Sequence, residues 1–177
     1  MKTIVKTIGF CTAAILLAIV PFACKKENMN GSMTVRMTDA PANFVQVNVD
    51  VTGLEIHHEA NGWMSIPINV GIYNLLDLQN DVNVILANNV KLPVGKVNQM
   101  RLILGANNSL VDSTTTTYPL DVPSGSESGL KINIDQVITS NNNLQILLDF
   151  DANASIVSKG NGGYSLKPVL KLKSVIQ

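Results

Sequence analysis

Three oxygen-bearing side chains stand two residues apart near the end of the chain: Asp149, Asp151 and Asn153. This D-x-D-x-N spacing opens calcium-binding loops, in which carboxylate and amide oxygens coordinate the ion. The three residues are therefore a candidate calcium site. The alternative is that the two carboxylates cap turns by accepting hydrogen bonds from backbone N–H groups.

The segment is not an EF-hand. Ala154 stands where that loop has its glycine, and Gly160 stands where it has its last glutamate. A calcium site would therefore need further oxygen ligands, for which Asp39 and Asp77 are candidates. We expect no other metal and no resident cofactor.

Two aromatic residues, Trp63 and Tyr73, are the candidates for ligand binding. Exposed tryptophan and tyrosine rings stack on the C–H faces of sugars. Trp63 directly follows Asn61-Gly62, a dipeptide that favours a hairpin turn. The alternative for a lone tryptophan is burial in the core, because tryptophan is highly buried on average.

The residues that nucleophilic or zinc chemistry would need are scarce. His57 and His58 are adjacent, so on a strand they point to opposite faces, and zinc needs three or four ligands. Ser124 and Ser126 lie in PSGSESG, which is not a G-x-S-x-G elbow. We therefore expect that this protein is not an enzyme. The alternative is a glycan-active hydrolase with paired acids, but the sequence has only four glutamates.

Alternation of apolar and polar residues begins at residue 33 and predicts strands. Met33, Val35 and Met37 share one face of the first. The next expected strand directs four valines inward: Val45, Val47, Val49 and Val51. After Gly53 the apolar residues change to even positions, which predicts a β-bulge.

The same alternation recurs along the rest of the chain, with turn residues every 8–12 positions. We expect single strands over 71–78 and 164–176, and either a helical turn or a strand over 83–92. About eight to ten short strands predict an all-β, antiparallel β-sandwich with an immunoglobulin- or transthyretin-like Greek key. Residues 33–177 would form this single domain.

The first 23 residues predict a secretory signal helix. Lys2 and Lys6 precede an apolar run that ends at Ala23. Residues 21–24, Pro-Phe-Ala-Cys, resemble the lipobox of bacterial lipoproteins. That resemblance implies cleavage between Ala23 and Cys24, followed by acylation of Cys24.

The cysteine content agrees with an acylated Cys24. The sequence has two cysteines, and Cys11 would leave with the signal peptide. The odd cysteine that remains in an exported chain calls for an explanation, which acylation provides. Residues 24–32 would then form a polar tether. The Cys-Lys-Lys-Glu sequence resembles lipoproteins of the Bacteroidetes and implies an outer-membrane anchor.

The predicted mature chain, residues 24–177, carries 11 basic and 13 acidic side chains. A net charge of −2 provides no cationic field for nucleic acid. Its length is that of one domain.

Several segments resemble, in order, the bacterial family known as domain of unknown function 4382. They are MTVRMTDAPA (33–42), VNVDVTGLEIH (47–57), NLLDL (74–78), LPVGKVNQMRLIL (92–104), VPSG (122–125), LLDFDA (147–152) and LKPVLK (166–171). The resemblance implies an exported lipoprotein, and the family has no established activity.

Together these observations predict a lipid-anchored envelope protein whose sandwich binds a glycan or a protein without catalysis. It would face the periplasm or the cell surface. The alternative is a structural lipoprotein that packs with other envelope proteins.

Overall fold

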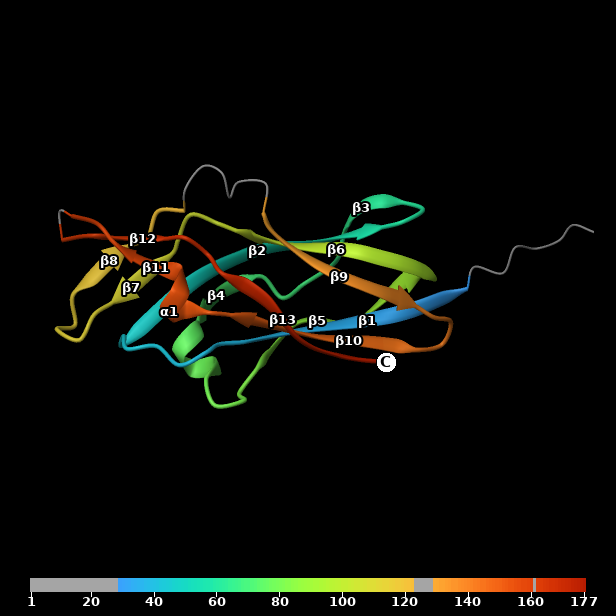
Figure 1. Ribbon diagram of the computed structural model, residues 1–177, viewed down its shortest axis with the longest axis horizontal. Helices are drawn as coiled ribbons and strands as arrows, with labels where there is room; N and C mark the ends of the chain where they lie inside the picture. Colours follow the sequence, from blue (N-terminus) through green and yellow to red (C-terminus); the bar gives the residue numbers. More distant parts are fainter. Residues whose placement is uncertain (1–28, 123–128, 161) are drawn as a thin grey trace, which may run out of the picture.

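The computed structural model describes residues 29–122, 129–160 and 162–177, and it is built almost entirely from strands (Figure 1). The elements in chain order are β1 (Asn30–Thr38), β2 (Gln46–His58), β3 (Gly62–Ser65), β4 (Gly71–Asn74), the 3₁₀ helix η1 (Leu75–Leu78), β5 (Val84–Pro93), β6 (Gly95–Leu104), β7 (Ser109–Val111), β8 (Thr117–Pro119), β9 (Leu130–Ile138), β10 (Asn143–Phe150), α1 (Ala152–Ser155), β11 (Ile156–Ser158), β12 (Tyr164–Leu166) and β13 (Leu170–Ile176).

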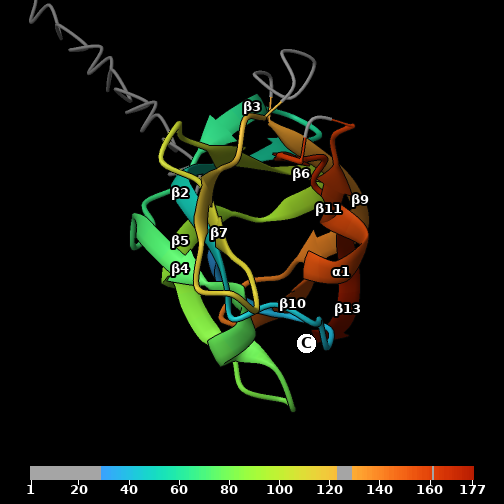
Figure 2. The ribbon, with the colours of Figure 1, turned by 90° about the vertical axis from the view of Figure 1, so that its left-hand side faces the viewer.

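Two sheets contain most of these strands. Sheet A has the order β13-β10-β1-β5, and sheet B has the order β8-β7-β2-β6-β9, with β3 and β4 also pairing with β2. Strands β11 and β12 form a separate ribbon. The view along the molecule shows the strands of both sheets around a common interior (Figure 2). The predicted all-β sandwich is therefore confirmed. The predicted signal helix lies outside the described residues.

At the centre of sheet A, a strand from the start of the domain sequence pairs with a strand from near its end. Strands β1 and β10 pair in parallel, with Val35 opposite Ile146, whereas the other pairs of named strands are antiparallel. A parallel pair cannot be closed by a hairpin and needs a crossover. Here the chain between β1 and β10 supplies the whole of sheet B.

The core follows from the alternation in the sequence. Met33, Val35 and Met37 are fully buried, and the side chains of β10 alternate between buried and half-buried. The largest core contributor of β10 is Phe150, which is 0% exposed. Burying a side chain of this size stabilises the fold by about 1.5–3 kcal/mol.

The predicted bulge at Gly53 is confirmed. The pairing of β2 with β6 shifts register between Val51 and Gly53. Val51 is buried before the shift, and Leu54 and Ile56 are buried after it. The extra residue therefore exchanges the two faces of β2 halfway along the strand.

Some expected boundaries were wrong. Val45 does not point inward; it is 48% exposed, because β2 begins only at Gln46. The tether expected to extend to residue 32 overlaps β1, which begins at Asn30. The ambiguous segment 83–92 is mostly strand β5.

Two expected strands are interrupted. The segment 71–78 changes from β4 to η1 because the Asn74 side chain caps the 3₁₀ turn and accepts the Leu76 N–H at 3.3 Å. The segment 164–176 divides around Pro168, which has no N–H to offer a ladder. Such interruptions contribute to a total of thirteen described strands instead of eight to ten.

Candidate functional site: a polar platform on sheet B

The bulge in β2 determines which side chains reach the outer face of sheet B. Past Gly53 the even-numbered residues enter the core, so Glu55 and His57 point outward. Strand β3 pairs with one side of this segment and β6 with the other, and β9 pairs with β6. Four adjacent strands therefore present one continuous face.

Eight side chains on this face form two rows across the four strands. Residues directly opposite each other in a sheet share a face. In the order β3, β2, β6, β9, the first row is Trp63, His57, Gln99 and Asn133, and the second row is Ser65, Glu55, Arg101 and Lys131. We call these eight residues the platform. With strands about 4.8 Å apart and successive rows two residues apart, it measures about 14 Å by 7 Å.

Neighbouring platform residues contact one another. The Gln99 side-chain amide donates to the side-chain oxygen Oδ1 of Asn133 at 3.0 Å, and the Ser65 hydroxyl donates to the Glu55 carboxylate at 3.1 Å. Arg101 forms an ion pair with Glu55. These contacts hold the planar amide, carboxylate and guanidinium groups in place before any ligand arrives.

Trp63 is the aromatic member of the platform. Its ring lies edge-on to His57, with centroids 5.2 Å apart, and the Arg101 guanidinium lies over the ring at 4.3 Å. The Lys131 ammonium lies 6.0 Å from the same ring. Trp63 is half-buried by these neighbours on the outer face, so the alternative that it fills the core was wrong.

Tyr73 does not join Trp63. It pairs with Val49, whose side chain is fully buried, and therefore lies on the core side of sheet B. Its hydroxyl donates to the Asn69 carbonyl oxygen at 2.6 Å, and burial raises the pKa of the phenol. The two predicted ligand-binding aromatics thus belong to opposite faces.

Four platform residues were not predicted from the sequence to belong to a site. Gln99, Arg101, Lys131 and Asn133 occupy the polar positions of two alternating strands, and that alternation would have assigned each to an outer face. Nothing in the sequence indicates that the two strands are neighbours, because 25 residues separate the end of β6 at Leu104 from the start of β9 at Leu130.

A second cluster surrounds Asp39, which is 3% exposed. One carboxylate oxygen accepts the Ala152 N–H at 2.8 Å, and the other accepts the Gln79 amide at 3.4 Å. Burial raises the pKa of the Asp39 carboxyl to about 6; the hydrogen bonds from Ala152 and Gln79 oppose the rise, and the charge of Asp149 adds to it. We call this cluster the Asp39 junction.

Thr38 adds a further link to the Asp39 junction. It is 1% exposed, and its hydroxyl lies 2.8 Å from the Leu78 carbonyl oxygen and 2.7 Å from that of Val82. Its neighbour Thr34 is buried for a similar reason, with its hydroxyl accepting the Asn89 N–H at 3.0 Å. Hydroxyls that pair with backbone groups can be buried at little cost.

The residues of the candidate calcium site are placed as follows. Asp151 caps α1 by accepting the Ala154 N–H at 2.9 Å, and it forms an ion pair with Lys171 at 2.7 Å. Asn153 is exposed in α1, and one oxygen of Asp149 is buried without a hydrogen-bond partner. Among the described residues no three Asp, Glu, His or Cys side chains come close enough to hold a metal ion. Calcium at these positions stays a prediction.

The two histidines lie on opposite faces, as expected for adjacent residues of a strand. His57 belongs to the platform, whereas His58 is 1% exposed. The Nδ1 atom of His58 accepts the Ala60 N–H at 3.2 Å.

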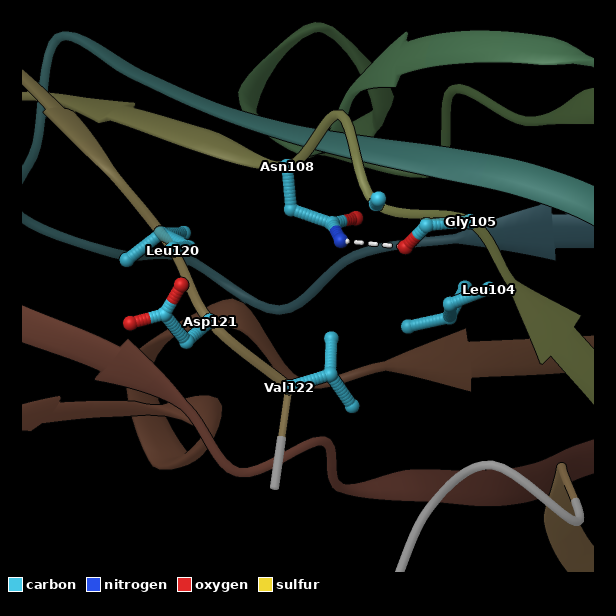
Figure 3. Close-up of a pocket in the computed structure, with 7 residues that line it drawn as sticks. Leu104, Gly105, Asn108, Leu120, Asp121 and Val122 are labelled. Carbon is cyan, nitrogen blue, oxygen red and sulfur yellow. Dashed lines mark hydrogen bonds between the residues drawn. The ribbon is translucent and has the colours of Figure 1, made fainter. Parts of the chain in front are cut away.

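A pocket of about 400 Å³ lies at the other end of sheet B (Figure 3). It is lined by Leu104, Gly105, Ala106, Asn108, Leu120, Asp121 and Val122. The Asn108 amide donates to the Gly105 carbonyl oxygen at 2.8 Å and its oxygen accepts the Asp50 N–H at 2.9 Å. The Asn108 side-chain amide in this pocket therefore already has hydrogen-bond partners within the protein.

Fold and platform together define an all-β sandwich domain that presents a polar, tryptophan-bearing sheet face. Residues 30–168 match the family described as Domain of unknown function (DUF4382), and the chain belongs to that family. The resemblance seen in the sequence is thereby confirmed. Neither the curated proteins nor the solved structures contained a match.

The predicted lipoprotein features lie outside the described residues. Ala23 and Cys24 precede residue 29, so acylation and cleavage stay predictions. Within the described ranges no helix has the length and apolar character to cross a membrane.

Proposed function

We propose that this protein is a non-catalytic binding module that recognises a glycan on the platform and is held at the outer membrane by a lipid on Cys24. The observation that carries the glycan proposal is the pair of in-register rows, which combine one aromatic ring with planar polar groups on an accessible face. Side-chain amides both donate and accept hydrogen bonds, as sugar hydroxyls do.

The carboxylates favour binding over catalysis. Glycoside hydrolysis requires two carboxyl groups that flank one bond. The platform contains one, Glu55, and Arg101 holds it in an ion pair. Asp39 has the raised pKa of a candidate acid, but it is buried on another sheet and both of its oxygens accept hydrogen bonds from the protein.

The test uses the fact that Trp63 is the only tryptophan of the sequence. We expect at least one member of a panel of neutral and acidic oligosaccharides to change its fluorescence saturably. Gln99→Ala should weaken that binding about fivefold, because one hydrogen bond contributes about 1 kcal/mol.

Tyr73→Phe is the matched control, since it removes a polar group from the opposite face of the same sheet. Its affinity should equal that of the wild type. A panel in which no oligosaccharide alters the emission, or an equal loss in Tyr73→Phe and Gln99→Ala, would reject the platform as a glycan site.

One observation favours a second candidate, assembly with other envelope proteins. Val70 and Ile72 are 65% and 57% exposed beside each other at the start of β4. Cross-linking that captures an envelope protein through wild type, and loses it in a Val70→Ser, Ile72→Ser variant with glycan binding intact, would support this function.

A further inference from the structure

Arg36 lies on the outer face of sheet A, far in the fold from the platform of sheet B. Its neighbours Val35 and Met37 enter the core, so its own side chain leaves the sheet on the opposite side. It stands between Leu147 of β10 and Ile85 of β5.

The Arg36 guanidinium has one buried donor that the described protein does not satisfy. Its Nε is buried without a hydrogen-bond partner, and no ion pair of the described residues includes it. The only other arginine of the sequence, Arg101, is paired with Glu55. A buried donor without a partner destabilises the fold, and a ligand that accepts its hydrogen bond would remove that cost.

The same arginine borders a small pocket of about 120 Å³. The lining residues are Arg36, Asn83, Gln145, Ile146, Leu147, Ser174 and Ile176. At about 30 Å³ for each water in the liquid, this volume corresponds to roughly four waters. It therefore suits a group of a few heavy atoms.

The pocket combines a cation, hydrogen-bonding groups and an apolar wall. Within the described ranges no side-chain hydrogen bond engages Gln145 or Ser174, so both can serve a ligand. Ile176 is 61% exposed at the rim beside the pocket. Asp149 follows Leu147 on the same face of β10 but does not line the pocket.

We propose that this pocket binds a small aliphatic carboxylate. The planar guanidinium matches a carboxylate in a bidentate fork, and the apolar wall of the pocket suits the alkyl part, which sulfate and phosphate lack. Gln145 and Ser174 donate to the remaining lone pairs, and the alkyl part contacts Leu147 and Ile176. The Arg36 pocket and the platform lie on different sheets. An experiment can therefore reject carboxylate binding at the pocket without rejecting glycan binding on the platform, and the reverse.

Arginine side-chain NMR tests the proposal directly, because the chain has two arginines and so two Nε–Hε signals. We expect sodium propionate to shift the Arg36 signal saturably while the Arg101 signal stays still. Sodium sulfate at equal ionic strength should shift the Arg36 signal at least tenfold less. Arg36→Lys keeps the charge but loses the fork, and should weaken propionate binding at least tenfold when the Gln145 side-chain amide is followed.

The apolar wall is tested with a second variant. Ile176→Ser should abolish any preference for propionate over formate, whereas Val157→Ser, an exposed valine of β11, should retain it. No saturable shift of the Arg36 signal, or an equal response to sulfate, overturns the proposal. Equal shifts of Arg36 and Arg101 also overturn it, because they indicate a general salt effect.

Discussion

At the scale of single residues, Gly95 shows what a family motif does in this fold. It is the glycine of Leu-Pro-Val-Gly-Lys and begins β6 with φ +142°. A Cβ atom there would lie 2.7 Å from Cε1 and Nε2 of His58. The ring cannot withdraw easily, because His58 is 1% exposed and its Nδ1 accepts the Ala60 N–H. Glycine is needed here for space and for backbone conformation together.

We therefore expect Gly95→Ala to lower the free energy of unfolding by about 2–4 kcal/mol, because overpacking and a positive φ each cost about 1–3 kcal/mol. Gly62→Ala is the control, since its φ is +69° with no atom within 4 Å of the new Cβ, and it should cost about 1 kcal/mol. Urea unfolding measures both.

A double-mutant cycle with His58→Ala separates the two contributions of Gly95. If the contact with the ring matters, Gly95→Ala should cost less when His58 is already alanine. Equal costs in both backgrounds would show that the backbone conformation alone demands glycine.

At the scale of elements, the Asp39 junction ties together segments that are distant in sequence. Thr38 ends β1 and Asp39 follows it, Leu78 ends η1, and Ala152 begins α1 one residue after β10. Three of the family-like segments, MTVRMTDAPA, NLLDL and LLDFDA, therefore meet at one place. Their shared role in this structure is to fasten the end of β1 to its neighbours.

The Asp39 junction should make stability depend on pH. Because the pKa of Asp39 is about 6 in the fold against an ordinary value of 3.8, the folded protein binds this proton more tightly than the unfolded chain. The resulting stabilisation is complete below about pH 4 and is lost as the pH rises through 6. After a discount for solvent screening we expect about 1–2 kcal/mol between pH 4.5 and 7.5.

Asp39→Asn should remove that pH dependence, since an amide keeps an acceptor for Ala152 but does not titrate in this range. Asp39→Ala should destabilise the protein at both pH values by about 1–3 kcal/mol, because the buried Ala152 N–H then has no acceptor. Guanidinium unfolding at the two pH values compares the variants. An unchanged slope in Asp39→Asn would assign the pH dependence to other groups.

At the scale of the whole molecule, β1 starts at the end of the sandwich that carries the Trp63 side of the platform. The Met29 carbonyl oxygen accepts the Val94 N–H at 3.2 Å, Gly95 lies against the His58 ring, and His58 precedes the turn into β3. The start of β1 and strand β3 lie at the same end of the molecule (Figure 1). With Cys24 as the anchor, residues 25–29 would span at most about 18 Å. The proposed anchor would therefore hold the platform close to the membrane surface.

Variants of the two cysteines test directly whether Cys24 carries the lipid anchor. Cells fed an alkyne analogue of palmitate should label the wild type and Cys11→Ala, because Cys11 belongs to the predicted signal peptide. Cys24→Ala should carry no label, and the mass of the mature wild type should correspond to an acylated chain that begins at residue 24. Label retained in Cys24→Ala would contradict lipidation at this residue.

The sequence alone was sufficient for the fold class and for the inward faces of several strands, but not for every strand boundary. Alternation identified the inward faces of β1 and of the first half of β2, and the change of phase at Gly53 identified the bulge, because burial on a strand repeats every second residue. The same alternation also placed His57 and His58 on opposite faces of the strand. What it could not supply was which strands become neighbours, since periodicity carries no information about pairing partners.

The tertiary structure decided the sites for that reason. Only the order β3-β2-β6-β9 brings Trp63, Arg101 and Lys131 to one face, and only the β6/β9 pairing places Gln99 beside Asn133. The parallel pairing of β1 with β10 and the packing around it likewise created the unpartnered Arg36. Local patterns determine the face on which a side chain lies, whereas long-range pairing determines the groups it meets.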